Sequence, residues 1–141
     1  MGEPMGYGIG SVLAVVVSLF ARMVKLDRDR AFYPTVLIVV GSYYVLFAAM
    51  SGSLPVVMAE TVLMMVFVAA AVAGFRWNLW IVAAGLAGHG VFDLFGRGIV
   101  RNTGVPEWWP AFCGAYDVCA GVCLAWFLAR KIIVDKQIRN C

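Results

Sequence analysis

Apolar residues fill this chain in five long runs, and polar residues gather in the short segments between them. The runs cover residues 7–24, 32–50, 53–75, 77–96 and 109–129. A helix needs about 20 apolar residues to cross a bilayer, and backbone groups in lipid must be paired within the protein, which favours helices. The pattern predicts an all-α polytopic membrane protein, a compact bundle of five transmembrane helices that forms one domain over residues 1–141.

Composition supports this class and argues against a soluble one. Hydrophobic residues make up 63% of the 141 residues and charged residues 13%, and the mean hydropathy is +0.90. A soluble domain of this size could not bury so much apolar surface, because small domains bury the smallest fraction of their surface. The net charge is +3, but the basic residues flank the apolar runs, so we expect no nucleic-acid partner.

The distribution of Lys and Arg predicts an orientation in the membrane. Five spans would place nine basic residues on one side: Arg22, Lys25, Arg28, Arg30, Arg76, Arg130, Lys131, Lys136 and Arg139. The other side would carry only Arg97 and Arg101. Because cytoplasmic loops are enriched in Lys and Arg, the N-terminus is predicted outside and the C-terminus in the cytoplasm. Glu3 stands where a signal peptide would be basic, so the first run is expected to be a retained span.

A few ionisable groups interrupt the apolar runs, and they share one depth. At a rise of 1.5 Å per residue, Glu60 and His89 lie roughly 10 Å below the predicted outer edge, Asp93 roughly 5 Å and Asp117 roughly 12 Å. Tyr43 and Tyr44 fall at the same level. Ionisable groups inside a membrane are costly and mark functional sites, so a polar layer in the outer half of the bilayer is the main functional signal.

This layer suggests acid/base chemistry. A carboxylic acid in apolar surroundings can keep its proton near neutral pH, and two neighbouring carboxyls can divide the roles of acid and base. We expect Glu60 and Asp117 to form this catalytic pair, with Asp93 orienting His89 or serving as the acid. Structural alternatives stay open: an Asp93–Arg97 ion pair at the membrane edge, a buried neutral His89, and interhelical hydrogen bonds of Glu60 and Asp117.

Aromatic and basic side chains around the layer are candidates for substrate binding. Tyrosine and tryptophan rings could line a pocket and stabilise a developing cation, or serve only as an interfacial belt. Arginines in "GRGIVRNTGVPEWWP" could bind an anionic head group, and this loop could act as a lid. The predicted substrate-binding residues are Tyr43, Tyr44, Tyr116, Arg97, Arg101, Trp108 and Trp109.

The remaining chemistry-bearing residues are expected to be structural. Cys113, Cys119, Cys123 and Cys141 form no C-x-x-C motif, so buried free thiols are predicted. With one histidine and no H-E-x-x-H motif, we predict no metal site and no cofactor; iron, manganese or zinc held by the histidine and the carboxylates stays open as an alternative. The small residues of 77–96, from Ala83 to Gly90, predict that this helix packs closely inside the bundle.

Two motifs carry a family resemblance. "GHGVFDLFGRG" and "NTGVPEWWPAFCGAYDVCAG" fit H-x-x-x-D followed by P-x-W-W-P-x-F-C-x-x-Y-D, and the chain here resembles small bacterial multi-span membrane proteins. The resemblance covers about the last third of the chain. It implies a multi-pass protein of the bacterial inner membrane, with His89, Asp93, Tyr116 and Asp117 as signature positions. In chemistry alone, the acidic residues are similar to those of integral-membrane terpene and meroterpenoid cyclases.

Three functions are compatible with the sequence. The first is a membrane-embedded enzyme that cyclises, isomerises or hydrolyses a lipid-like or isoprenoid-like substrate. The second is a structural or accessory membrane subunit whose polar layer binds another membrane protein. The third is a small proton-coupled transporter. Expected partners are a lipophilic small molecule and membrane lipids, and a homo-oligomer is left open.

Overall fold

The computed structural model describes residues 3–96 and 98–130, and every regular element in these ranges is helical. The elements are α1 (Glu3–Met23), the 3-10 helix η1 (Leu26–Asp29), α2 (Phe32–Ser51), α3 (Leu54–Arg76), α4 (Leu79–Phe95) and α5 (Trp109–Ala129). The predicted all-α class and the five-helix bundle are therefore confirmed. The predictions from sequence also involve residues that lie outside the described ranges: Arg97, Lys131, Lys136, Arg139 and Cys141.

The helices begin and end at residues with the expected local chemistry. The Asn78 side chain accepts a hydrogen bond from the Trp80 amide at 2.8 Å, which caps the start of α4. Gly52 adopts a left-handed conformation, with φ of 72°, and turns the chain from α2 into α3. Pro55 and Pro110 occupy the first turns of α3 and α5, where a missing amide proton costs little.

One span is shorter than predicted. Four helices are long and apolar enough to cross a membrane, whereas α4 has 17 residues and falls below that length. The sequence pattern of 77–96 overestimates it because Asn78 and Gly96 belong to the caps. At 1.5 Å per residue, α4 spans about 25 Å, and much of its surface is covered by its neighbours.

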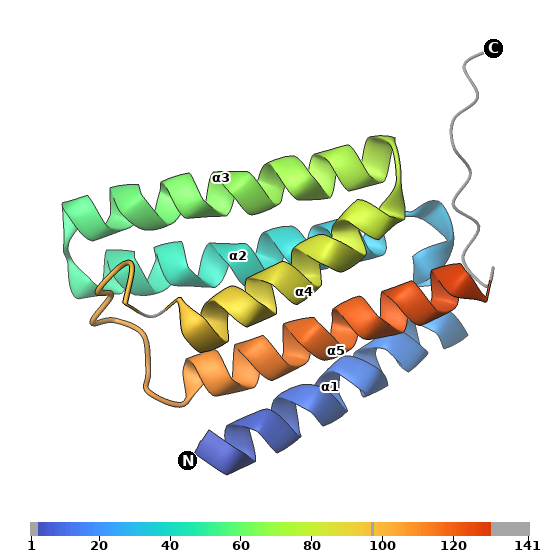
Figure 1. Ribbon diagram of the computed structural model, residues 1–141, viewed down its shortest axis with the longest axis horizontal. Coiled ribbons are helices and arrows are strands. Elements are labelled where there is room, and N and C mark those ends of the chain that lie inside the picture. Colours follow the sequence, from blue (N-terminus) through green and yellow to red (C-terminus); the bar gives the residue numbers. More distant parts are fainter. Residues whose placement is uncertain (1–2, 97, 131–141) are drawn as a thin grey trace.

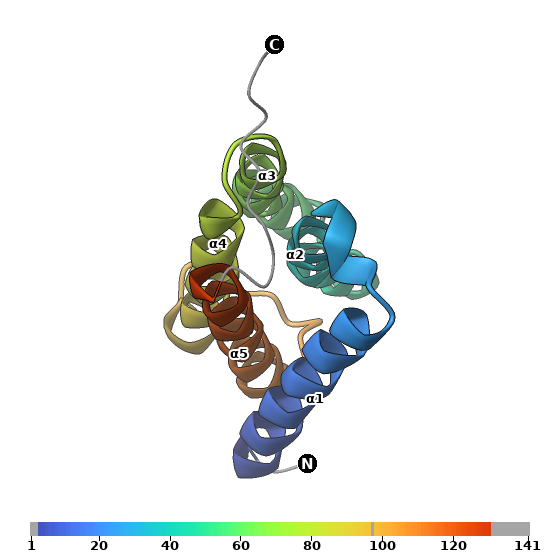
Figure 2. The same ribbon diagram turned by 90° about the vertical axis from the view of Figure 1, so that its right-hand side faces the viewer.

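The helices run alternately up and down, and the α4–α5 loop lies at the same end as the α2–α3 turn (Figure 1). We call this the loop end. Helix α4 packs against α5 and α3, α2 packs against α3, and α1 packs mainly against α5. Figure 2 shows α1 and α2 standing apart on one side of the bundle. Helices α4 and α5 therefore form the centre of the bundle, whereas α1 and α2 do not pack directly against each other.

Glycines set the distance between α4 and α5. A Cβ atom on Gly90 would lie 2.6 Å from the Gly114 carbonyl oxygen, and one on Gly121 would lie 2.9 Å from the Ala83 oxygen. Backbone meets backbone at these positions, so no side chain fits. The predicted close packing of the small-residue helix is confirmed at Gly90, whereas Gly88 faces open space.

The surface of the bundle is apolar, as expected for helices in contact with lipid. Val62 on α3 is 67% exposed and Phe95 at the end of α4 is 82% exposed. The core between the helices is formed by fully buried side chains that include Leu37, Leu86 and Leu124. A hydrophobic exterior around a small packed core is the pattern of a membrane protein.

Candidate functional site

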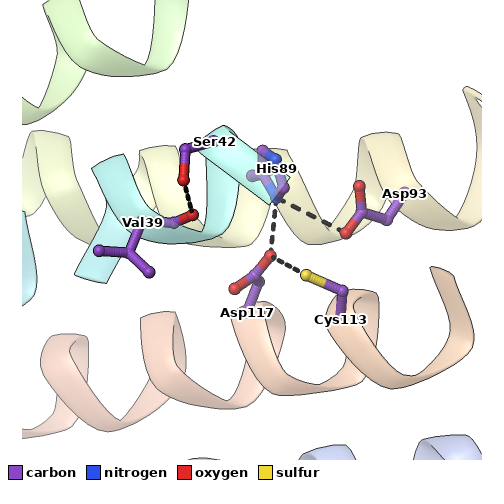
Figure 3. A network of polar contacts seen from close by, with 6 residues as sticks. All are labelled: Val39, Ser42, His89, Asp93, Cys113 and Asp117. Carbon is purple, nitrogen blue, oxygen red and sulfur yellow. Dashed lines mark hydrogen bonds and ion pairs between the residues drawn. The ribbon is translucent and has the colours of Figure 1, made fainter. Parts of the chain in front are cut away.

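Four ionisable side chains from α4 and α5 meet in the core near the loop end (Figure 3). His89 Nδ1 lies 2.7 Å from Asp117 Oδ2 and 3.6 Å from Asp93 Oδ2. Cys113 donates weakly to the same Asp117 oxygen, with an Sγ–Oδ2 distance of 3.6 Å. Two i, i+4 pairs, one on each helix, thus face each other across the close α4–α5 contact. We call these four residues the α4–α5 cluster.

The cluster is almost inaccessible to solvent. Asp117 is 0% exposed, Asp93 2% and His89 3%. Neither oxygen of Asp93 has a hydrogen-bond partner of normal geometry among the described residues, and neither does Asp117 Oδ1, although the Tyr44 hydroxyl and the Cys113 thiol lie close to Asp93. Buried polar atoms are nearly always hydrogen-bonded in proteins. Three carboxylate oxygens without such bonds therefore indicate a functional role for the cluster in addition to its structural one.

Aromatic rings hold the imidazole of His89 in place. The Phe67 ring stands edge-on to it with centroids 4.6 Å apart, and the Tyr44 ring does so at 6.1 Å. Edge-to-face contacts of this kind fix ring orientation. In Figure 3 the hydroxyl of Ser42 bonds to the Val39 carbonyl of its own helix, at 2.7 Å, and so serves α2 itself.

Glu60 is buried on α3 and belongs to a neighbouring polar group. Its Oε1 accepts a hydrogen bond of 3.1 Å from Asn102 Nδ2, which also donates to the Tyr44 carbonyl oxygen at 2.9 Å. The sequence-based expectation paired Glu60 with Asp117. In the structure Asp117 is bonded to His89 instead, because the glycine contact brings α5 directly against α4, while α3 presents Glu60 to the loop.

Small cavities separate Glu60 from the α4–α5 cluster. One of about 30 Å³ is lined by residues that include Tyr44, Glu60 and Asp93. A second, of about 10 Å³, lies between Glu60, Phe67 and His89. A cavity needs roughly 10–15 Å³ to hold a water molecule, so the larger one has room for water between the two carboxyl groups. The hydroxyl of Tyr44 is buried near Asp93, without a hydrogen bond of normal geometry.

A much larger apolar groove reaches the cluster from the side on which α1 and α2 stand apart. Its volume is about 440 Å³, within the range of small-molecule sites. Leu13 and Val39, which are 40% and 43% exposed, lie at its rim. Its wall also includes Val36, Tyr43, Trp109, Phe112, Cys113 and Tyr116. Cys113 therefore belongs both to the groove and to the buried cluster.

The predicted substrate-binding residues do not all lie in one place. Tyr43, Tyr116 and Trp109 line the groove, and the Tyr43 and Trp109 rings contact each other edge-to-face at 5.0 Å. Tyr44 lies inside, beside His89. The Trp108 ring packs against the Trp109 ring, with the ring centroids 5.5 Å apart. Arg101 is exposed on the loop, away from the buried carboxylates, and Arg97 lies outside the described residues.

No family model, curated protein or solved structure matches this chain. The site must therefore be interpreted from its own residues. Sequence reasoning placed His89, Asp93 and Asp117 at one depth, and they meet as expected. It missed the parts played by Cys113, Asn102 and Phe67. The i, i+4 spacing of Cys113 and Asp117 was a usable signal for the first, whereas nothing local marks the other two.

The docking of the α4–α5 loop rests on Asn102, which gives a testable prediction. Asn102→Asp keeps the acceptor for the Gly104 amide but replaces the donor to Glu60 with a second carboxyl group. We expect the loop to undock and trypsin to cleave after exposed Arg101 several-fold faster. Adding Glu60→Gln restores a donor to the pair and should bring cleavage back toward the wild-type rate. Equal rates in all three proteins would contradict this role of Asn102.

Proposed function

We propose that this protein is a membrane-embedded enzyme that acts on a lipophilic substrate by acid/base chemistry. The observation that carries the proposal is the position of Cys113, whose side chain lines the apolar groove and lies 3.6 Å from Asp117. An apolar groove suits the hydrocarbon part of a lipid-like or isoprenoid-like molecule. The His89–Asp117 pair, buried directly behind Cys113, would exchange a proton with that molecule across this wall.

Four buried residues would take separate roles in the proton transfer: His89, Asp117, Asp93 and Glu60. His89 gives or takes the proton, since imidazole exchanges protons near neutral pH. Asp117 holds Nδ1 at 2.7 Å and balances the positive charge of the imidazolium. Asp93 and Glu60, facing the 30 Å³ cavity, would return the proton through water. Cyclisation, isomerisation and hydrolysis of an alkene, epoxide or ether-like group are the reactions that need these steps.

The substrate would enter laterally from the lipid. The groove rim is apolar and lies where α1 and α2 stand apart, so a hydrocarbon chain can slide in without meeting water. Tyr43, Tyr116 and Trp109 present ring faces and edges along it, which would stabilise a cationic intermediate. The exposed Arg101 would remain available to an anionic head group at the membrane surface.

A transport function has less support. Fully buried Leu37, Leu86 and Leu124 form an apolar layer on the side of the cluster away from the loop end. A proton or ion pathway needs polar groups or water across such a layer. An accessory role, with a dry and fully paired polar layer, fits poorly with the unsatisfied oxygens of Asp93 and Asp117. Localisation in the bacterial inner membrane, with the loop end outside, belongs to the same proposal.

The groove can be tested before a reaction is known. Val36→Trp places an indole in the groove, whereas Val62→Trp places the same group on the exposed face of α3. Each protein is purified in mild detergent and its bound lipids are extracted and identified by mass spectrometry. We expect a lipid that co-purifies with the wild type and Val62→Trp at about equal levels, but not with Val36→Trp. Equal amounts in all three would show that the groove is not the binding site.

Turnover is tested on a panel of isoprenoid alkenes, their epoxides, and ester and ether lipids. Asp117→Asn should lower the rate by about 10²-fold or more, the usual contribution of an acid/base group, and Glu60→Gln should lower it less. Asp27→Asn is the control, because Asp27 is equally buried but pairs with Arg22 at 3.2 Å, outside the α4–α5 cluster. Full activity in both Asp117→Asn and Glu60→Gln would refute the acid/base assignment.

A further inference from the structure

The α4–α5 cluster has the composition of a transition-metal site. It supplies an imidazole nitrogen, a thiol sulfur and two carboxyl groups, and one ligand atom from each lies within 4.8 Å of all the others. Zinc is bound in proteins by this mixture of nitrogen, sulfur and oxygen. No sequence motif marks this set of four ligands, because the residues come from two helices and match no metal-binding spacing.

The distances suit a small tetrahedral ion. Ligand atoms that lie about 2.0–2.3 Å from zinc stand roughly 3.3–3.7 Å from one another. His89 Nδ1 to Asp93 Oδ2 and Cys113 Sγ to Asp117 Oδ2 are both 3.6 Å. The hydrogen-bonded pair His89 Nδ1 to Asp117 Oδ2, at 2.7 Å, would open by less than about 1 Å, and the most widely separated ligand atoms, within 4.8 Å of each other, would close by about as much.

The unsatisfied oxygens provide an independent argument. Asp93 is 2% exposed, and neither of its oxygens has a hydrogen-bond partner of normal geometry among the described residues, although His89 Nδ1, at 3.6 Å, the Tyr44 hydroxyl and the Cys113 thiol are near it. Asp117 Oδ1 is likewise buried and unpartnered. A buried carboxylate left in this way is expensive. A dication bound to Asp93 Oδ2 and Asp117 Oδ2 offsets the two carboxylate charges and gives Asp93 Oδ2 the partner it lacks.

We propose that His89, Asp93, Cys113 and Asp117 bind one transition-metal dication of the zinc type. The metal takes the place of the proton between His89 and Asp117 and of the thiol proton of Cys113, and both protons are released to solvent on binding. The neighbouring rings of Phe67 and Tyr44 keep the imidazole in the orientation that binding requires. Because four protein ligands fill a tetrahedral site, the ion would hold α4 and α5 together behind the groove rather than bind the substrate itself.

Metal binding can be measured without any substrate, so this inference and the proposed function fail or succeed separately. The full chain is purified without a histidine tag and its metal content is determined by mass spectrometry. The expected result is about one zinc or iron ion per chain. Cobalt(II) added to the chelator-treated protein should produce the visible bands of tetrahedral cobalt and a near-ultraviolet band from thiolate ligation.

Variants locate the site. Cys113→Ser should abolish the thiolate band, and both Cys113→Ser and Asp93→Asn should weaken cobalt binding by roughly 10-fold or more. Cys119→Ser is the matched control, since Cys119 is a half-buried free thiol on the same helix outside the cluster, and it should bind like the wild type. Circular dichroism confirms that each variant is helical.

Two outcomes would overturn the proposal. The first is a helical wild-type protein that contains no metal and gives no cobalt bands at micromolar concentrations, in which case the cluster is a hydrogen-bonded proton site only. The second is cobalt binding that survives both Cys113→Ser and Asp93→Asn, which would place the ion elsewhere. Turnover that persists in the metal-free protein would leave the proposed function intact while removing the metal from it.

Discussion

Gly90→Ala should destabilise the bundle by about 2–3 kcal/mol, because overpacking against atoms that cannot move has costs of this size. The new Cβ atom would lie 2.6 Å from the Gly114 carbonyl oxygen and 3.0 Å from the Val118 amide nitrogen. Both are backbone atoms of α5, so relief requires the two helices to separate. Separation also lengthens the bond between His89 and Asp117, and metal binding or turnover should fall together with stability.

The measurement is equilibrium unfolding in mixed micelles with sodium dodecyl sulfate, followed by circular dichroism. Gly88→Ala is the control two residues away, because a Cβ atom there meets nothing within 4 Å. Alanine favours helix over glycine by up to about 1 kcal/mol, so Gly88→Ala should be neutral or slightly stabilising. Equal stability of the two variants would mean that α4 and α5 do not pack as closely as described.

The buried pair of His89 and Asp117 should show strong energetic coupling. Asp117→Leu and His89→Leu each leave one partner buried without the other, and breaking such a pair costs about 3–5 kcal/mol. Replacing both removes the unpaired group, so the double variant should be less destabilised than either single variant. The coupling free energy should reach about 2 kcal/mol or more.

This cycle is measured with a chelator present, so that any bound metal does not contribute to the difference. His89→Leu combined with Asp27→Asn serves as the reference, because Asp27 pairs with Arg22 outside the cluster. Those two changes should add within about 0.5 kcal/mol, as independent sites do. Additive costs for His89→Leu and Asp117→Leu as well would show that the 2.7 Å contact contributes nothing to stability.

Five apolar runs were enough to predict the helices and the bundle, because a membrane span is a property of local composition. The observed helix boundaries differ from the predicted ones by a few residues where capping residues end a helix. The difference is clearest at α4, which begins after Asn78 and ends before Gly96. The common depth of His89, Asp93 and Asp117 also followed from sequence, since rise per residue converts position into height along the helix.

Which groups touch one another could not be obtained in this way. Height leaves the rotation and the spacing of neighbouring helices undetermined, and these depend on contacts such as Gly90 against the backbone of α5. Because of this packing, Asp117 forms a hydrogen bond with His89 rather than with Glu60, and Cys113 lies in the same cluster. Sequence alone determined that ionisable groups share one layer of a helical membrane protein. Tertiary packing decided their partners, because hydrogen bonds and metal ligation depend on differences of about 1 Å between side chains from separate helices.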